Sequence, residues 1–471
     1  MKKIFLILLT SLMLCQGKSN ANVRLPAVIA SNMVLQRQSN VNLWGWSDPA
    51  EKIYITTSWS NKKYAVTAND NAQWKLNIAT PKAGGPYTIT IKGNNQIVLT
   101  NILIGEVWVC SGQSNMEWSS NEGNKQILEE MPKSANDQIR LFHVPKTTAD
   151  TPQADCLGQW KVCGPESLKG FSAIGYFYAK KLQKELGVPV GIINASWGGT
   201  AAEAWTASQV ITSNETLKNA ASKLVRGPCC PVEPGVLFNA MINPLTNFNI
   251  AGVIWYQGES NTKTNGTYQS LFTSMIKDWR KQWQKEFPFY FVQIAPYRYD
   301  ITNIGILLRE QQTKSLALPN TGMVVISDLV DNVNDIHPQN KLDVANRLAK
   351  LALAKTYKKD VGVYQSPLFK QMQMKAAKVM LFFDHAPTGF KVKGSGEPSN
   401  FLIAGANKVF VPAEVKLEKD RIVVWSKDVS EPLAVRFAFD NTSMPNVFNK
   451  EGLPLTAFRT DNWEVATIPI K

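Results

Sequence analysis

Apolar strands alternate with amphipathic helices in the middle of the chain, and this alternation limits the possible folds most strongly. Between residues 102 and 357 six apolar segments indicate strands: Val107–Cys110, Ile139–Val144, Val190–Ile193, Val253–Tyr256, Phe289–Ile294 and Met323–Ser327. Helical periodicity occurs over Ile174–Leu186, Tyr268–Trp283 and Leu342–Tyr357. This order favours an open, mostly parallel sheet covered by helices, which binds its ligands at the carboxyl ends of the strands.

The two ends of the chain have a different pattern. Short alternating segments separated by turn residues, such as Lys52–Thr57, occur from about residue 23 to 101 and again from about residue 362 to 471. This pattern is typical of antiparallel β-sandwiches. We therefore predict an α/β fold in three parts: an N-terminal β-sandwich domain over 22–101, the central domain over 102–360, and a C-terminal β-rich domain, packed on the others, over 361–471.

Residues 1–21 are predicted to be an export signal. Lys2 and Lys3 are followed by the apolar stretch Ile4–Leu14, which is shorter than the roughly 20 residues that a membrane span needs. Ser19–Ala21 is a small-residue cleavage site. A lipoprotein attached through Cys15 is the alternative, but Leu14 is bulky where such sites want a small residue. We expect an exported protein, periplasmic or extracellular, without a membrane span.

Charge and cysteine content exclude several classes of partner and site. The chain of 471 residues has a net charge of +14, but its basic residues are scattered and not interleaved with aromatic residues, so we expect no nucleic-acid partner. A mildly cationic surface is compatible with an anionic glycan. The sequence has no CxxC motif and only three histidines, so it predicts no metal site.

Five cysteines lie outside the predicted signal, so at least one cannot pair within the chain. Cys156 and Cys163 are close enough in sequence to close a short loop in an oxidising compartment. The adjacent Cys229 and Cys230 are left unassigned, and Cys110 is predicted to be a small buried residue.

Two polar segments that follow predicted strands contain candidates for nucleophile and backbone donors. Ser114, in Gly112-Gln113-Ser114-Asn115, lies where a strand gives way to a helix. Ser114 can act as a nucleophile if a base removes its hydroxyl proton. The alternative is that it only caps the helix. Gly198 and Gly199 follow the predicted strand Val190–Ile193. There they either allow backbone N–H groups to approach a ligand or form an ordinary turn.

Two further segments contain candidate amide, acid and base groups. Gln257, Glu259 and Asn261 follow the strand Val253–Tyr256, where an amide can donate to an oxyanion or cap a loop. In Asp335-Ile336-His337-Pro338, the proline keeps His337 out of the helical conformation, and a carboxylate lies two residues before it. The competing pair Asp384-His385 lies in the C-terminal β region, away from every other motif.

In this order the motifs resemble those of the SGNH hydrolase superfamily, in particular the sialate O-acetylesterase-like carbohydrate esterases. The stretches that carry the resemblance are GQSNMEW, NASWGGTAAEAW, LFNAMINPL, IWYQGESN and DIHPQNK. Further matches are GGPYTITI, LREQQ and a C-terminal stretch from AVRFAFDN to TAFRTDNW, so that the resemblance spans almost the whole chain beyond residue 21.

The resemblance implies a role for each matching residue. Ser114 looks like the nucleophile, His337 the general base and Asp335 the acid that orients the imidazole. The implied oxyanion hole consists of the Ser114 N–H, an N–H at Gly198 or Gly199, and the Gln257 amide. Many members of the superfamily place the acid three residues before the histidine, where this chain has Asn334. Glu259 therefore remains a rival for the orienting acid, with Asn261 as a supporting residue.

The implied activity is removal of O-acetyl groups from carbohydrates through an acyl-enzyme that releases acetate, without metal or cofactor. O-acetylated sialic acids are the first expected substrate, and acetylated xylan or another polysaccharide is the alternative. A non-catalytic carbohydrate-binding protein is the alternative of another class. Four tryptophans lie in or beside the motifs, and we expect one or two of them to face the substrate: Trp118, Trp197, Trp205 and Trp255. The sequence does not predict the oligomeric state.

Overall fold

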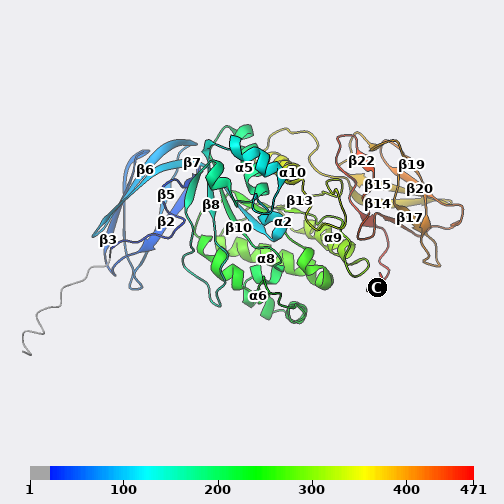
Figure 1. Ribbon diagram of the computed structural model, residues 1–471, viewed down its shortest axis with the longest axis horizontal. Helices are drawn as coiled ribbons and strands as arrows, with labels where there is room; N and C mark the ends of the chain where they lie inside the picture. Colours follow the sequence, from blue (N-terminus) through cyan, green and yellow to red (C-terminus); the bar gives the residue numbers. More distant parts are fainter. Residues whose placement is uncertain (1–21, 471) are drawn as a thin grey trace, which may run out of the picture.

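The computed structural model describes residues 22–470, and the predicted export signal lies outside the described residues. Three parts follow one another along the longest axis of the molecule, from the N-terminal β-strands through a central sheet with helices to the C-terminal sheets (Figure 1). Within residues 22–470 no helix is long and apolar enough to cross a membrane.

The N-terminal part is built from two β layers. One is the antiparallel pair β2 (Asn40–Trp46) and β5 (Gln73–Ala79). The other contains β3 (Lys52–Thr57), β4 (Ser60–Thr67), β6 (Gly84–Lys92) and the first half of β7 (Gln96–Gly112), with β1 (Val34–Gln36) parallel to β7. Alternate residues such as Ile53 and Ile55 are buried, because successive side chains of a strand point to opposite faces.

Strand β7 belongs to both the N-terminal layer and the central sheet. Its first half pairs with β6, and its second half, Glu106–Gly112, lies between β10 and β11. The predicted strand Val107–Cys110 lies within the continuously buried part of β7, Ile102–Gly112. The predicted boundary between residues 101 and 102 falls inside β7. Before Ile102 exposed and buried side chains alternate, whereas the residues after it are all buried. Because the pattern changes at this point, the sequence did not indicate one continuous strand.

The central sheet has the order β13-β12-β11-β7-β10-β8-β9. The strands not yet introduced are β8 (Asn136–His143), β9 (Trp160–Cys163), β10 (Val190–Ser196), β11 (Gly252–Tyr256), β12 (Phe289–Val292) and β13 (Thr321–Val324). Neighbours on this path are parallel except for β9, which is antiparallel to β8. The predicted parallel sheet is thus confirmed.

Helices cover both faces of this sheet. Helices α5 (Ala173–Leu186) and α10 (Lys341–Lys355) lie on one side, and α6 (Ser208–Thr212) and α8 (Tyr268–Trp283) on the other (Figure 1). The other α-helices of residues 22–470 are α2 (Ser114–Glu117), α3 (Lys125–Glu130), α4 (Pro165–Leu168), α7 (Glu215–Ala221) and α9 (Ile304–Lys314). Leu271, Met275 and Trp279 of α8 are buried at four-residue spacing, which explains why the sequence predicted this helix.

The C-terminal part is a set of small antiparallel sheets with its own apolar core. One sheet has the order β14 (Leu368–Lys375), β15 (Lys378–Asp384), β20 (Ile422–Trp425), β19 (Glu414–Leu417). A second has the order β18 (Val411–Pro412), β17 (Phe401–Ala404), β21 (Ala434–Phe437), β23 (Phe458–Arg459). A third pairs β16 (Phe390–Val392) with β22 (Val447–Asn449).

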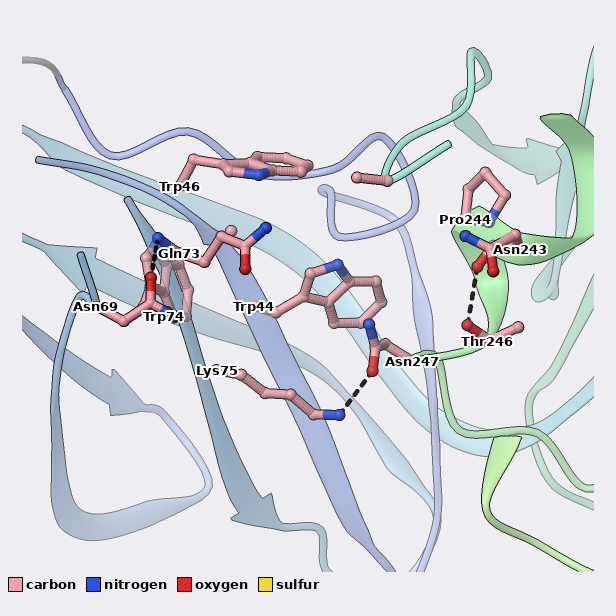
Figure 2. A pocket seen from close by; sticks show the side chains of 12 residues that line it. Trp44, Trp46, Asn69, Gln73, Trp74, Lys75, Asn243, Pro244, Thr246 and Asn247 are labelled. Carbon is pink, nitrogen blue, oxygen red and sulfur yellow. Dashed lines mark hydrogen bonds between the residues drawn. The ribbon is translucent and has the colours of Figure 1, made fainter. Parts of the chain in front are cut away.

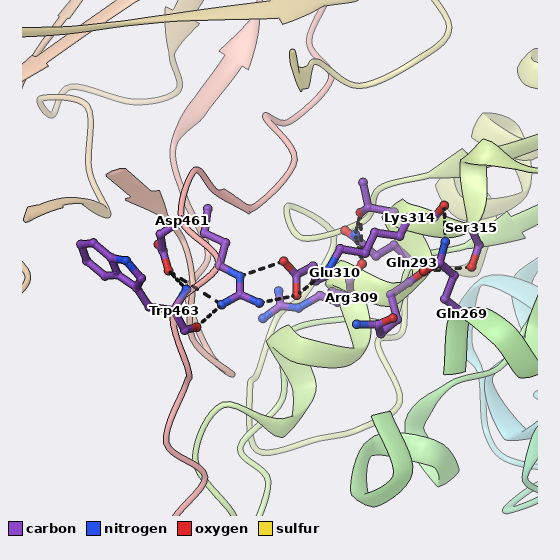
Figure 3. Close-up of polar contacts among 11 residues, drawn as sticks. Gln269, Gln293, Arg309, Glu310, Lys314, Ser315, Asp461 and Trp463 are labelled. Carbon is purple, nitrogen blue, oxygen red and sulfur yellow. Dashed lines mark hydrogen bonds and ion pairs between the residues drawn. The ribbon is translucent and has the colours of Figure 1, made fainter. Parts of the chain in front are cut away.

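Helix α9 attaches the C-terminal part to the central part. Arg459 donates two hydrogen bonds to the Glu310 carboxylate, at 2.8 and 3.0 Å, and a third to the carbonyl of Trp463 at 2.7 Å. Figure 3 shows Glu310 of α9 close to Asp461 and Trp463 of the C-terminal segment. The Arg459 and Glu310 side chains are only 13% and 15% exposed, so that water weakens this ion pair little.

Replacement of Arg459 tests this attachment. We expect Arg459→Gln to lower the free energy of unfolding by about 2 kcal/mol, because it removes charge-assisted hydrogen bonds from a largely buried carboxylate. Lys314, which is 47% exposed and 3.3 Å from the same carboxylate, is the matched control. Lys314→Gln should cost less than about 0.5 kcal/mol. Urea denaturation measures both values, and equal losses would contradict the assigned role of Arg459.

Candidate active site

The register of three parallel strands brings three predicted motifs to one edge of the sheet. Gly112 of β7 lies beside Ser196 of β10 on one side and Tyr256 of β11 on the other. The residues that follow these three positions therefore leave the sheet together at its carboxyl edge. They are Gln113–Asn115, Trp197–Gly199 and Gln257–Asn261.

Gly112 makes the turn that presents Ser114. Its φ is +133°, and a Cβ there would lie 2.1 Å from the carbonyl oxygen of Tyr256, so only glycine fits. The Gln113 N–H donates to that carbonyl at 3.0 Å, and the Trp197 N–H donates to the Gly112 carbonyl at 3.0 Å. The turn is thus tied to both neighbouring strands, and Ser114 begins α2 with its side chain partly exposed.

The loop between β13 and α10 brings His337 to Ser114. The Asn115 side-chain amide donates to the carbonyl of Ile336 at 3.0 Å, and the Asn124 amide donates to the carbonyl of Gln339 at 2.8 Å. Nε2 of His337 lies 3.0 Å from Oγ of Ser114, although the two residues are 223 positions apart in sequence. This distance is within hydrogen-bond reach of a nucleophile and its base.

Two neighbours fix the His337 ring. The imidazole stacks on the indole of Trp118, with ring centroids 4.7 Å apart and an interplanar angle of 19°. At the edge of the ring, Nδ1 lies 3.7 Å from Oδ1 of Asp335. The same oxygen accepts the His337 backbone N–H at 2.9 Å. Asp335 is therefore close enough to attract a proton on Nδ1, although 3.7 Å exceeds a hydrogen-bond distance.

Glu259, the rival acid, lies deeper in the protein. Its Oε1 accepts the Asn115 side-chain amide at 2.7 Å, and among residues 22–470 Oε2 has no hydrogen-bond partner. Burial raises the pKa of the Glu259 carboxyl. Asn115 thus links Glu259 to the His337 loop, and of the two acids Asp335 is the one that lies near the imidazole.

Lys341 is a site residue that the sequence analysis missed. It is the first residue of α10 and only 1% exposed, and its Nζ donates to Oδ1 of Asn115 at 2.6 Å. The ammonium also lies 5.1 Å from the ring of Trp118 and 5.8 Å from that of Tyr256. Burial lowers the pKa of Lys341 to about 7. A lysine at a helix start gives no sequence signal of such burial.

The electrostatic surroundings keep the imidazole neutral near pH 7. Burial lowers the pKa of His337 below its ordinary value of 6.5, and the nearby positive charge of Lys341 lowers it further. The carboxylates of Asp335 and Glu122 act in the opposite direction but do not reverse the shift. A neutral imidazole next to a serine hydroxyl can accept its proton.

The glycine loop presents one free backbone donor rather than two. The Gly198 N–H donates to Oε2 of Glu117 at 2.5 Å, and the other oxygen of Glu117 pairs with Lys146. Gly199 is exposed with a φ of +72°. Within the described residues the N–H groups of Gly199 and Ser114 have no hydrogen-bond partner. Because the Gly198 N–H is bound to Glu117, of the two predicted glycines only Gly199 has an N–H that is free to donate to a ligand.

Gln257 differs from its predicted role as an oxyanion donor. Its side chain is fully buried, and its amide nitrogen already donates to the carbonyl of Thr200 at 3.2 Å and to Oδ1 of Asn261 at 2.7 Å. Asn261 is buried too and donates to Glu203 at 2.8 Å. Both amide hydrogens of Gln257 are thus used inside the loop, so these two residues hold the motif together rather than face Ser114.

Gln113 offers the amide donor that Gln257 lacks. Its Oε1 accepts the backbone N–H groups of Gly258 and Ser260 at 3.3 and 3.2 Å, which fixes the orientation of the amide. In the described part of the chain its Nε2 donates no hydrogen bond. Gln113 was not among the predicted site residues, although it directly precedes Ser114.

The structure corrects one prediction about the cysteines and assigns the adjacent pair for which no prediction was made. Cys156 and Cys163 are free thiols, so the predicted loop closure between them is wrong. Cys229 and Cys230, left unassigned, form a disulfide. This disulfide packs against the glycine loop, where a Cβ at Gly199 would lie 2.4 Å from Sγ of Cys230.

No cluster of three metal-ligating side chains occurs among the residues that the structure describes.

Two of the four tryptophans beside the motifs lie next to the catalytic candidates at the surface. Trp118 and Trp197 are partly exposed, whereas Trp205 and Trp255 are fully buried and pack edge to face in the core. The Trp197 indole N–H donates to the carbonyl of Cys229 at 3.2 Å, which fixes its position beside the disulfide. Trp118 and Trp197 are therefore the tryptophans that are able to contact a substrate at Ser114.

Comparisons with known proteins identify the family. Residues 104–354 match the family model described as carbohydrate esterase, sialic acid-specific acetylesterase. The chain belongs to this family. Sialate O-acetylesterase of Homo sapiens is 30% identical over 398 residues, 76% of each chain, and that of Mus musculus is 29% identical over 441 residues, 80% and 82% of the two chains.

A solved structure supports the same assignment over nearly the whole chain. The crystal structure of a carbohydrate acetylesterase from Xanthomonas citri superimposes with a TM-score of 0.85 at 37% identity, covering 94% of this chain and 100% of that one. The resemblance and the α/β fold inferred from the sequence are thereby confirmed. The protein is a carboxylic ester hydrolase.

The pKa shifts predict the pH dependence of ester hydrolysis. Protonation of His337 removes the base, so kcat/KM should fall on the acid side with a midpoint below 6.5. Lys341→Met removes a positive charge that lowers the pKa of His337, and the midpoint should therefore rise. Lys355→Met, at the other end of α10, is the matched control and should leave it unchanged. A pH profile with p-nitrophenyl acetate measures all three, and a midpoint that falls in Lys341→Met would contradict this electrostatic assignment.

Proposed function

We propose that this esterase removes O-acetyl groups from carbohydrates, with O-acetylated sialic acids as its substrates, through a Ser114–His337–Asp335 mechanism. The observation that carries the mechanism is the 3.0 Å separation between Nε2 of His337 and Oγ of Ser114. The family match and the sialate O-acetylesterases among the relatives support the substrate.

Acylation uses the serine and the histidine together. Oγ of Ser114 attacks the acetyl carbonyl carbon while Nε2 of His337 takes the hydroxyl proton, which gives a tetrahedral oxyanion and an imidazolium. The Asp335 carboxylate, 3.7 Å from Nδ1, favours the tautomer with its proton on Nδ1 and stabilises the imidazolium. Stacking on Trp118 holds the ring in the plane that this transfer needs.

Three donors around Ser114 form the proposed oxyanion hole. They are the N–H groups of Ser114 and Gly199, which have no partner in the described residues, and the amide Nε2 of Gln113. In this proposal Gln113 takes the place that the sequence analysis gave to Gln257. Loss of one good oxyanion donor typically raises the barrier by about 2.7–4 kcal/mol.

Departure of the sugar completes acylation, and hydrolysis of the acetyl-serine follows as deacylation. The imidazolium gives its proton to the departing sugar oxygen as the tetrahedral intermediate collapses to the acetyl-serine. Water then attacks the acetyl carbon while His337 takes its proton, and collapse of the second intermediate returns that proton to Ser114 and releases acetic acid, which ionises to acetate. Every proton in this scheme moves through Nε2 of His337.

A polysaccharide acetylester is the second candidate substrate. The relative from Xanthomonas citri, described as a carbohydrate acetylesterase, shares 37% identity over 94% of this chain, more than the 30% of the human sialate O-acetylesterase. For either substrate we propose that the protein is exported to the periplasm or the outside of the cell, which the apolar pattern of residues 4–14 supports.

Replacement of the nucleophile and the base tests the mechanism. Ser114→Ala and His337→Asn should each lower kcat for p-nitrophenyl acetate by about 10⁴-fold or more, because neither step proceeds without them. His385→Asn is the matched control, since His385 lies in the turn after β15. Circular dichroism checks that all three variants fold. Retention of full activity by Ser114→Ala would refute the mechanism.

A direct comparison of substrates tests the proposed specificity. We expect kcat/KM for acetate release from 9-O-acetyl-N-acetylneuraminic acid to exceed that from acetylated xylo-oligosaccharides by at least tenfold. Enzymatic acetate determination measures both, with Ser114→Ala as the blank. The reverse order would favour the polysaccharide substrate, and no release from either would favour a carbohydrate-binding protein over an esterase of sugars.

A further inference from the structure

A cavity of about 310 Å³ lies between the strand pair β2–β5 of the N-terminal part and residues 243–247 of the central part, which precede β11. Its walls combine tryptophan rings with amide and ammonium groups, and Figure 2 shows these side chains around a common space: Trp44, Trp46, Gln73, Lys75, Asn243 and Asn247. The volume is within the range of small-ligand sites. We call this cavity the crease.

The pairing of β2 with β5 explains why these side chains meet. Trp44 lies opposite Lys75 and Trp46 opposite Gln73, and residues directly opposite each other in an antiparallel pair project to the same face. That face of the two strands is turned toward the central part of the protein. Trp44 also packs edge to face on Phe248, with ring centroids 6.5 Å apart, which fixes its indole in place.

The polar groups of the crease are oriented by contacts with the central part. Nζ of Lys75 donates to Oδ1 of Asn247 at 2.6 Å, and the Asn243 amide donates to the carbonyl of Gln153 at 2.8 Å. The Gln73 side chain is exposed, and no partner for its amide occurs among residues 22–470. Its amide is therefore available to a ligand as both donor and acceptor.

Trp74 contributes to the back wall of the crease but is only 3% exposed, and its position between Gln73 and Lys75 on β5 turns its indole to the other face of the strands. Within the described part of the chain no acidic side chain lines the crease, so these walls offer no carboxylate base for ester hydrolysis.

We propose that the crease is a second carbohydrate-binding site that takes a pyranose unit of a glycan. The C–H groups of one sugar face would pack against indole rings, which supply apolar contact area at low entropic cost. Sugar hydroxyls both donate and accept hydrogen bonds, and the amides of Gln73 and Asn247 and the ammonium of Lys75 offer matching partners. Aromatic rings together with uncharged amides fit a sugar better than a purely apolar ligand.

The crease is separate from the candidate active site. Asn247 precedes the amino end of β11, whereas Gln257 and Glu259 follow its carboxyl end. The two places thus lie at opposite edges of the central sheet, and the crease shares no lining residue with the motifs around Ser114. A sugar in the crease would hold a glycan on the enzyme without contacting the ester under attack, so this inference is independent of the proposed substrate.

Calorimetric titration of the full chain tests the proposal. In the Ser114→Ala background we expect saturable binding of xylohexaose or of 3′-sialyllactose, the two probes that distinguish a neutral from an acidic glycan. Added to this background, Trp46→Ala should weaken that binding about tenfold through loss of an aromatic face. Gln73→Ala, an exposed position that does not threaten folding, should weaken it about threefold.

Matched controls lie elsewhere in the N-terminal part. Trp59→Ala and Gln96→Ala replace residues of the same types that do not line the crease, and neither should change the affinity. The proposal is overturned if neither probe binds at concentrations up to about 10 mM, or if binding is unchanged in both Trp46→Ala and Gln73→Ala. Because ester hydrolysis is not measured, the result does not depend on the mechanism at Ser114.

Discussion

The alignment of Gly112 with Ser196 and Tyr256 is the constraint on which the candidate active site depends. Hydrogen bonds of two parallel ladders fix this register, and a shift of one residue would turn every following side chain to the other face of the sheet. The turn at Gly112 is tied to both neighbours by backbone hydrogen bonds, so it cannot move without breaking the sheet. Ser114 is therefore placed by the rigid centre of the protein rather than by a mobile loop.

A buried polar network adds the histidine to this rigid frame. Asn115 donates to Glu259 and to the carbonyl of Ile336, and accepts from Lys341. Burial of a lysine and a glutamate without such partners would cost several kcal/mol, so the network stabilises the fold only when the His337 loop is in position. Asn115, the residue after the nucleophile, thus binds the buried Glu259 and Lys341 and also the loop that carries His337. The same burial keeps the imidazole neutral, which is the form that catalysis needs.

The sequence predicted the parts of this arrangement that depend on local patterns. Helix α8 matches the predicted Tyr268–Trp283, and the motifs with Ser114, Gly198 and Gln257 do follow strand ends. It could not predict contacts that depend on side-chain distances. The Gln257 amide donates to Thr200 and Asn261, and the Gly198 N–H donates to Glu117. Lys341 is buried, with its ammonium against the ring of Trp118. The length of β7 was missed for another reason, since its pattern changes where it passes from a half-buried sheet to a fully buried one.

Strand β7 also gives the crease a fixed orientation relative to the active site. Glu106 is buried where β7 enters the central sheet, pairs with Arg37 at 2.6 Å, and accepts hydrogen bonds from Gln36 at 2.8 Å and from Tyr357 at 2.9 Å. These contacts join the N-terminal layers, the central sheet and the end of α10 at one point. A hinge between the first two parts would have to break a continuous strand and expose this carboxylate. The crease and Ser114 are therefore held at a constant separation, and a glycan long enough to reach both could be positioned by one site for attack at the other.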